Sequence, residues 1–107
     1  MTPPYVVDVF AALADPTRRA LLTKLQHDGE CDVGALVAAH DVSQPAISRH
    51  LRILLDAGLV AVRQHGRRRH YRVQADGLLP LISYLTAFWD QRLAALDSVL
   101  DELEERT

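Results

Sequence analysis

The strongest structural signal in this chain is the segment Val42-Ser43-Gln44-Pro45-Ala46-Ile47-Ser48-Arg49-His50-Leu51. Ser43 is a residue type that caps helix amino termini, and Pro45 falls in the first turn, where its missing N–H has no intrahelical partner to lose. The apolar residues that follow recur at helical spacing on one face: Ile47, Leu51, Leu54 and Leu55. The stretch therefore predicts a helix that begins after Ser43, buries one face and ends at Gly58.

A second, shorter helix is expected just before this one, over residues 33–40, with Asp32 as its cap and Asp41-Val42 as a tight connection. A short helix, a tight turn and a second helix make a helix-turn-helix, whose second helix enters the major groove of DNA. Glutamine suits adenine and arginine suits guanine. We therefore expect DNA contacts from Ser43, Gln44, Pro45, Ser48, Arg49, His50 and Arg52. His50 lies toward the side of the helix, so packing inside the protein is an equal alternative for it.

Two strand-like runs follow, over residues 59–64 and 69–73, with Gly66 in the link between them. Their apolar positions alternate as in a half-buried hairpin: Val60, Val62, Tyr71 and Val73. The tip is basic, and a solvated turn would not call for three consecutive arginines that repel one another. The pattern favours a wing, in which Arg67, Arg68 and Arg69 contact the flanking phosphates or the minor groove.

The charge of the chain is divided unevenly along its length. The formal net charge is −2, yet residues 43–75 carry seven arginines and one aspartate, while both flanks are acidic. A basic middle between acidic flanks indicates one polyanion-binding face. Chance clustering on a solvated surface is the alternative, but arginine alone, without lysine, favours planar contact with phosphates or guanine edges.

The remaining elements are three helices. One is expected over residues 6–14, a second from Asp15-Pro16 to about His27, and a long last one over residues 80–105. The order is thus four helices, two strands and a final helix: a mainly α chain with a small β-hairpin (α+β). With 107 residues, 49% hydrophobic content and one cysteine, residues 1–107 are expected to form a single domain. The absence of a signal peptide or long apolar run favours the cytoplasm.

The last helix has more apolar width than one small protomer needs to cover. A stripe of this kind, rimmed by charge, implies a partner surface. We expect a homodimer interface that includes Leu81, Leu85, Phe88, Trp89, Leu96, Val99 and Leu103. The alternative is that the whole stripe packs on the core of its own protomer.

Four segments together resemble the arsenical-resistance-repressor (ArsR) family. They are Ala14-Asp15-Pro16-Thr17-Arg18-Arg19, the opening stretch, Ala57-Gly58-Leu59-Val60 and the Arg67–Tyr71 hairpin, and the resemblance spans about residues 9–103. It implies a winged-helix homodimer joined by the first and last helices, with Val6 and Phe10 contributing. It also implies binding of double-stranded DNA at an inverted-repeat operator overlapping a promoter. Recognition-helix roles fall to Ser43, Gln44, Ser48, Arg49 and His50, and wing roles to Arg67–Arg69.

The ligands of the family's metal sensors are missing from the sequence. Aligning the Ser-Gln-Pro segments puts Asp32 and Gly34 where those sensors carry cysteines, with Cys31 beside these positions, and residues 81–107 contain no histidine. His65 and His70 flank the hairpin tip without a nearby carboxylate. We expect no metal site and no cofactor. Cys31 is interpreted as a buried bystander, or as a thiol that acts only between subunits or through modification.

Two other functions compete with a repressor that lacks a sensor. One is a ligand- or redox-responsive repressor with an effector pocket between the final helices, around Phe88 and Trp89. The other is a winged helix used only for protein–protein contact, which would show no salt-dependent DNA affinity. No catalytic constellation stands out, so an enzyme is not expected. Arg18 and Arg19 were open to two roles, a phosphate contact or a salt bridge to a carboxylate of the last helix.

Overall fold

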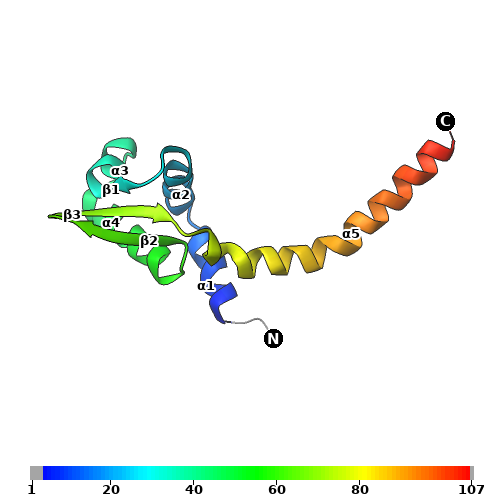
Figure 1. Ribbon diagram of the computed structural model, residues 1–107, viewed down its shortest axis with the longest axis horizontal. Coiled ribbons are helices and arrows are strands. Elements are labelled where there is room, and N and C mark those ends of the chain that lie inside the picture. The colour runs from blue at the N-terminus through cyan, green and yellow to red at the C-terminus, as the bar shows by residue number, and fades with distance from the viewer. Residues whose placement is uncertain (1–3, 107) are drawn as a thin grey trace.

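The computed structural model describes residues 4–106, with side chains described from Val9 onward, so the side chain of Val6 lies outside the described residues. Figure 1 shows a winged body of short helices and a small sheet, from which one long helix projects. The elements in order are α1 (Pro4–Leu13), α2 (Pro16–Asp28), β1 (Cys31–Asp32), α3 (Val33–Ala39), α4 (Gln44–Asp56), β2 (Val60–His65), β3 (Arg68–Val73), a 3-10 turn η1 (Ala75–Leu78) and α5 (Leu79–Glu105).

Three helices begin where their capping residues predict. The Asp15 carboxylate accepts hydrogen bonds from the backbone N–H groups of Thr17 at 2.8 Å and Arg18 at 3.1 Å. Asp32 accepts from Ala35 N at 2.9 Å, and Ser43 Oγ accepts from the backbone of the first turn of α4. Each side chain satisfies a backbone donor that has no partner within its own helix.

The sheet has three strands rather than the two expected. Its order is β1-β3-β2, all antiparallel, because Cys31 and Asp32 pair with Tyr71 and His70 of β3. The expected order of elements was therefore wrong in omitting β1, and it also omitted η1. A two-residue strand is too short to show the alternation by which strands are recognised in a sequence. Its pairing is fixed by residues about 40 positions further along the chain.

The core lies between the helix-turn-helix, α2 and the inner face of the sheet. Ile47, Leu51 and Leu54 of α4 are fully buried, so the face predicted for that helix is confirmed. They form one apolar cluster with buried residues from the other elements: Val9, Ala12, Leu21, Leu25, Cys31, Leu36, Leu59, Val60 and Tyr71. This cluster holds α4 against the body with its opposite face free.

Helix α5 leaves the body and contributes no buried residue (Figure 1). Large apolar side chains along its length are about half exposed: Leu79, Ile82, Tyr84, Leu85, Phe88, Trp89, Leu93, Leu96, Val99, Leu100 and Leu103. The alternative in which the whole stripe packs on its own protomer is wrong. Leu81 departs from the interface expectation, because it packs against the core of its own protomer.

The joint between the sheet and α5 depends on a close approach of two backbones. Gly77, in η1, lies so near Gly58 that a Cβ on Gly77 would stand 1.8 Å from the Gly58 carbonyl oxygen. Any larger residue at position 77 must push the two segments apart. Gly58 itself has a φ of 76°, a conformation that glycine adopts without steric cost. The two glycines thus fix where the chain turns from the winged body into α5.

Candidate nucleic-acid interface

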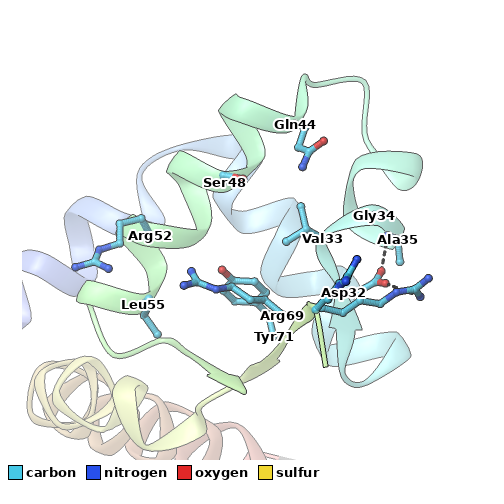
Figure 2. Close-up of a pocket in the computed structure, with 12 residues that line it drawn as sticks. Asp32, Val33, Gly34, Ala35, Gln44, Ser48, Arg52, Leu55, Arg69 and Tyr71 are labelled. Carbon is cyan, nitrogen blue, oxygen red and sulfur yellow. Dashed lines mark hydrogen bonds and ion pairs between the residues drawn. The ribbon is translucent and has the colours of Figure 1, made fainter. Parts of the chain in front are cut away.

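A groove of about 750 Å³ separates α4 from the β2–β3 hairpin (Figure 2). Gln44, Ser48 and Arg52 follow one another along α4 at four-residue steps and form one side of it. Arg69 and Tyr71 come from β3 on the other side. Also lining the groove are Asp32, Val33, Gly34, Ala35, Leu55, Arg67 and Arg68. The structure thus brings together six of the ten residues that the sequence predicts to contact DNA.

Three more residues of the expected recognition set lie at the start of α4 or on its exposed face. Ser43, Pro45 and Arg49 are exposed but do not line the groove. Arg49 follows Ser48 by one position, so it projects about 100° further round the helix. Arg52 is held toward the helix end by an ion pair with Asp56, with Nε 3.1 Å from Oδ1. The amino-terminal half of α4 therefore presents an outer face without an acidic residue.

The wing ends in a two-residue loop of Gly66 and Arg67, since His65 and Arg68 form the last pair of the ladder. Gly66 has a φ of 65°, at the position where a type II′ hairpin turn requires glycine. Arg68 differs from its neighbours, because its Nη1 lies 3.3 Å from Asp32 Oδ2 at the start of α3. All three wing arginines are exposed, but among the described residues only Arg68 of the three forms an ion pair. The three arginines of the wing are therefore not equivalent.

A second ion pair holds the hairpin to the body. Arg63 Nε donates to Glu30 Oε1 at 2.6 Å, and this bond lowers the pKa of the Glu30 carboxyl below its ordinary value. Together with the pair between Arg68 and Asp32, it ties β2 and β3 to the segment that joins α2 to α3. Two such tethers keep the wing beside the helix-turn-helix, although exposed pairs add little to overall stability.

His50 does not share the exposed face of α4. Its side chain is only 12% exposed, and its Nδ1 lies 3.3 Å from Arg18 Nη1 and 4.0 Å from Asp15 Oδ1. Of the two alternatives for His50, the structure favours packing inside the protein. The prediction that it contacts DNA with the other α4 residues loses its geometric support.

Among the described residues, Arg18 and Arg19 form no salt bridge to α5, and their guanidinium groups bond to backbone carbonyl oxygens instead. Arg18 Nε donates to Ala12 O at 2.7 Å and Nη2 donates to Ala11 O at 3.0 Å. Arg19 Nη1 donates to Leu13 O at 2.8 Å. Both guanidinium groups therefore satisfy the carbonyl oxygens at the carboxyl end of α1, where the helix dipole favours cations. Basic residues soon after a helix end were the sequence signal for this role.

The described part of the chain also bears on metal and redox chemistry. Among the described side chains, which begin at Val9, no group of three or more His, Cys, Asp or Glu is placed to hold a metal ion. The rings of His65 and His70 meet edge to face, with centroids 6.1 Å apart. Burial raises the pKa of the Cys31 thiol, which disfavours the reactive thiolate.

No helix in the described part of the chain is long and apolar enough to span a bilayer.

The sequence is similar to bacterial regulatory proteins of one family. Residues 15–62 match the model of the arsR family of bacterial regulatory proteins. The HTH-type transcriptional regulator Rv2034 of Mycobacterium tuberculosis is 42% identical over 84% of this chain and 83% of its own length. The arsenical resistance operon repressor of Escherichia coli is 43% identical over 63% of this chain and 57% of its own length.

Solved structures of proteins from the same family have a similar fold. An ArsR family transcriptional regulator, RHA00566, superposes with a TM-score of 0.76 at 29% identity, covering 89% of this chain and 95% of its own. A homodimeric winged helix-turn-helix domain from Mycobacterium bovis, a possible ArsR-family regulator, gives 0.65 at 30% identity over 83% and 82%. The fold and the relatives define a winged helix-turn-helix DNA-binding transcriptional regulator. The chain belongs to the arsR family of bacterial regulatory proteins.

Proposed function

We propose that this protein is a homodimeric transcriptional repressor that reads an inverted-repeat operator and carries no metal sensor. The observation that carries the proposal is the continuous surface formed by the exposed face of α4 and the arginine-bearing wall of the groove. A repressor with this surface covers its operator and excludes the transcription machinery. Relatives described as repressors support this direction of regulation.

The two parts of the surface have different tasks. Gln44, Ser48 and Arg49 stand on the first two turns of α4, the part of a recognition helix that reads base edges in the major groove. Ser43 and Pro45 lie at the helix start, beside backbone N–H groups that favour a phosphate. Arg67 and Arg69 reach the backbone or minor groove beyond. Arg68 contributes a DNA contact while it remains paired with Asp32, and Arg52 contacts phosphate near the groove.

The two-fold symmetry of the operator follows from a dimer built on α1 and α5. On a helical projection the half-exposed apolar residues of α5 gather on one side, with Phe88, Leu85, Leu96, Trp89 and Leu100 among them. Phe10 of α1 meets Tyr84 of α5 edge to face, with centroids 5.4 Å apart, so the two helices form one surface. The homodimeric relative from Mycobacterium bovis has the same fold. Burial of this surface by a second copy removes the large exposed apolar area.

The proposal that the protein has no metal sensor rests on the structural contacts of Asp32. Asp32 stands where, by family resemblance, metal sensors carry a cysteine. Here its carboxylate caps α3 through Ala35 N and pairs with Arg68 of the wing. Both carboxylate oxygens therefore have structural partners within the protomer.

The DNA-binding part of the proposal is tested on duplexes selected by the protein from its own upstream DNA. Three cationic contacts per protomer, from Arg52, Arg67 and Arg69, predict that log K falls against log salt with a slope of about −5. Fluorescence anisotropy between 50 and 300 mM salt (roughly a Debye length of 14 to 6 Å) measures it. The complex is expected to survive added zinc or arsenite. Binding that does not depend on salt would instead favour a protein-interaction module. Release of the DNA by metal would refute the proposal that the protein carries no metal sensor.

The dimer is tested by placing a charge on the exposed apolar side of α5. Leu96→Glu is expected to convert the protein to a monomer at micromolar concentration, because the new carboxylate would be buried without a partner. Sedimentation velocity measures the change. Ser98→Glu, on the opposite side of the same helix turn, is the matched control and is expected to remain dimeric. A Leu96→Glu protein that stays dimeric would place the interface elsewhere.

A further inference from the structure

Arg18 connects the three helices α1, α2 and α4, although it lies outside the surface proposed to contact DNA. It stands in the first turn of α2, donates to two carbonyl oxygens at the end of α1, and reaches His50 in the middle of α4. Asp15, the cap of α2, lies beside the same histidine at 4.0 Å. One planar guanidinium group therefore spans from the helix of the proposed dimer surface to the recognition helix.

The chemistry of the two side chains fixes the direction of their hydrogen bond. A guanidinium group has donors but no acceptor. A hydrogen bond across the 3.3 Å between Arg18 Nη1 and His50 Nδ1 therefore requires Arg18 to donate and His50 Nδ1 to accept, with the ring proton on Nε2. The 12% exposure of His50 leaves this bond little competition from water.

Helices α1 and α4 share the apolar core, in which Val9 and Ala12 are buried with Leu51 and Leu54. A cleft of about 400 Å³ lies between them, lined by Ala11 and Ala12 of α1, by Arg18, and by Ile53, Asp56 and Ala57 at the end of α4. Apolar packing does not fill this cleft, and Arg18 reaches from its lining to His50 on α4. Helix α1 in turn contacts α5 through Phe10 and Tyr84. A change at Arg18 therefore alters the link between α4 and the α1–α5 pair.

We propose that Arg18 is a positioning residue that acts through His50 to fix the orientation of α4 relative to the dimer surface. The inference rests on the proposed dimeric, DNA-binding function. In a dimer, the angle between α4 and the α1–α5 pair sets the distance between the two recognition helices. That distance must match about one helical turn of DNA for both half-sites to be read together. Arg18 contributes to specificity without contacting DNA.

The test compares affinity for the selected duplex with affinity for random DNA of the same length. Arg18→Gln is expected to lower this ratio about tenfold, the effect of losing one hydrogen bond to a charged group. Arg19→Gln is the matched control, because Arg19 also donates to the end of α1 but has no bond to α4. It is expected to leave the ratio within about twofold. Equal losses in the two variants would show a merely structural role and overturn the proposal.

Variants at His50 test the same link from the other end. His50→Ala removes the acceptor and is expected to reproduce the tenfold loss, whereas His50→Gln supplies a carbonyl oxygen that Arg18 can reach and is expected to restore most of the ratio. If Arg18→Gln fails to fold, the two His50 variants and Arg18→Lys decide the question. A His50→Gln protein no better than His50→Ala would contradict a role for the hydrogen bond.

A readout without DNA separates this inference from the proposed function. Nitrogen-15 NMR of the free protein is expected to show His50 as the Nε2–H tautomer, and to show a mixture of tautomers in Arg18→Gln. An unchanged tautomer overturns the inference even if the protein proves to be a repressor. If the wild-type protein binds no DNA, the proposed function fails, and the tautomer still decides whether Arg18 holds His50.

Discussion

A protein carrying both Arg49→Ala and Arg67→Ala is expected to remain a folded dimer and to lose at least about a hundredfold in affinity for its selected duplex. Arg49 stands on the exposed face of α4, and Arg67 stands in the loop of the wing. An arginine that bonds to guanine contributes about 1–3 kcal/mol of discrimination, and a symmetric dimer loses each contact twice. Neither side chain touches the core, so the fold has no reason to change.

The two arginines are expected to fail in different ways when they are changed singly. Arg49→Ala should lower affinity for the selected duplex more than for random DNA, because it removes a base contact. Arg67→Ala should weaken both and reduce the salt slope by about 1 per protomer, because it removes a phosphate contact. Lys24→Ala with Arg106→Ala removes the same charge away from the groove and is the matched control. Unchanged affinity in the Arg49 and Arg67 double variant would refute the assignment of α4 and the wing.

Gly77→Ala is expected to destabilise the protein by about 3 kcal/mol or more, because its Cβ has no room. The nearest atoms are backbone: the Gly58 carbonyl oxygen at 1.8 Å, its carbon at 2.5 Å and Leu59 N at 3.1 Å. Backbone atoms cannot rotate away as a flexible side chain does, so η1 must separate from the end of α4. Urea unfolding, followed by the circular dichroism of the helices, measures the loss.

Gly34→Ala provides the opposite expectation with the same chemical change. Gly34 lies in α3, and a Cβ there would meet only Asp32 Oδ1 at 3.6 Å, an ordinary contact. Alanine is the better helix former by about 1 kcal/mol, so this variant should be as stable as the parent or more stable. If the two substitutions destabilise equally, the close approach of Gly58 and Gly77 is not what holds the joint.

The helices could be predicted because their signals are local. Asp15, Asp32 and Ser43 each bond to a backbone N–H two or three residues away, so the cap and the helix start are neighbours in sequence. The buried faces follow the helical period in the same way. Strand β1 and turn η1 were missed because each is short, and β1 is defined only by its partner β3.

The candidate site was predicted in part for the same reason. Gln44, Ser48 and Arg52 share a side of α4 by spacing alone, and the wing follows from a basic hairpin tip. Spacing could not show that Arg68 is engaged by Asp32, or that His50 turns inward to Arg18. Each of these pairs joins residues more than 30 positions apart.

The segment from Val42 to Leu51 was enough to predict a capped helix with one buried face and a polar outer face, and the arginine hairpin after it was enough to predict the wing. These are properties of neighbours in the chain, where capping, periodicity and turn chemistry act over a few residues. Three further features became visible only in the folded protein: which arginines of the site form ion pairs, where α5 leaves the body, and how Arg18 and His50 join two helices. Those outcomes depend on contacts between distant segments, which form only once the core of Leu21, Leu36 and Leu51 has brought the segments together.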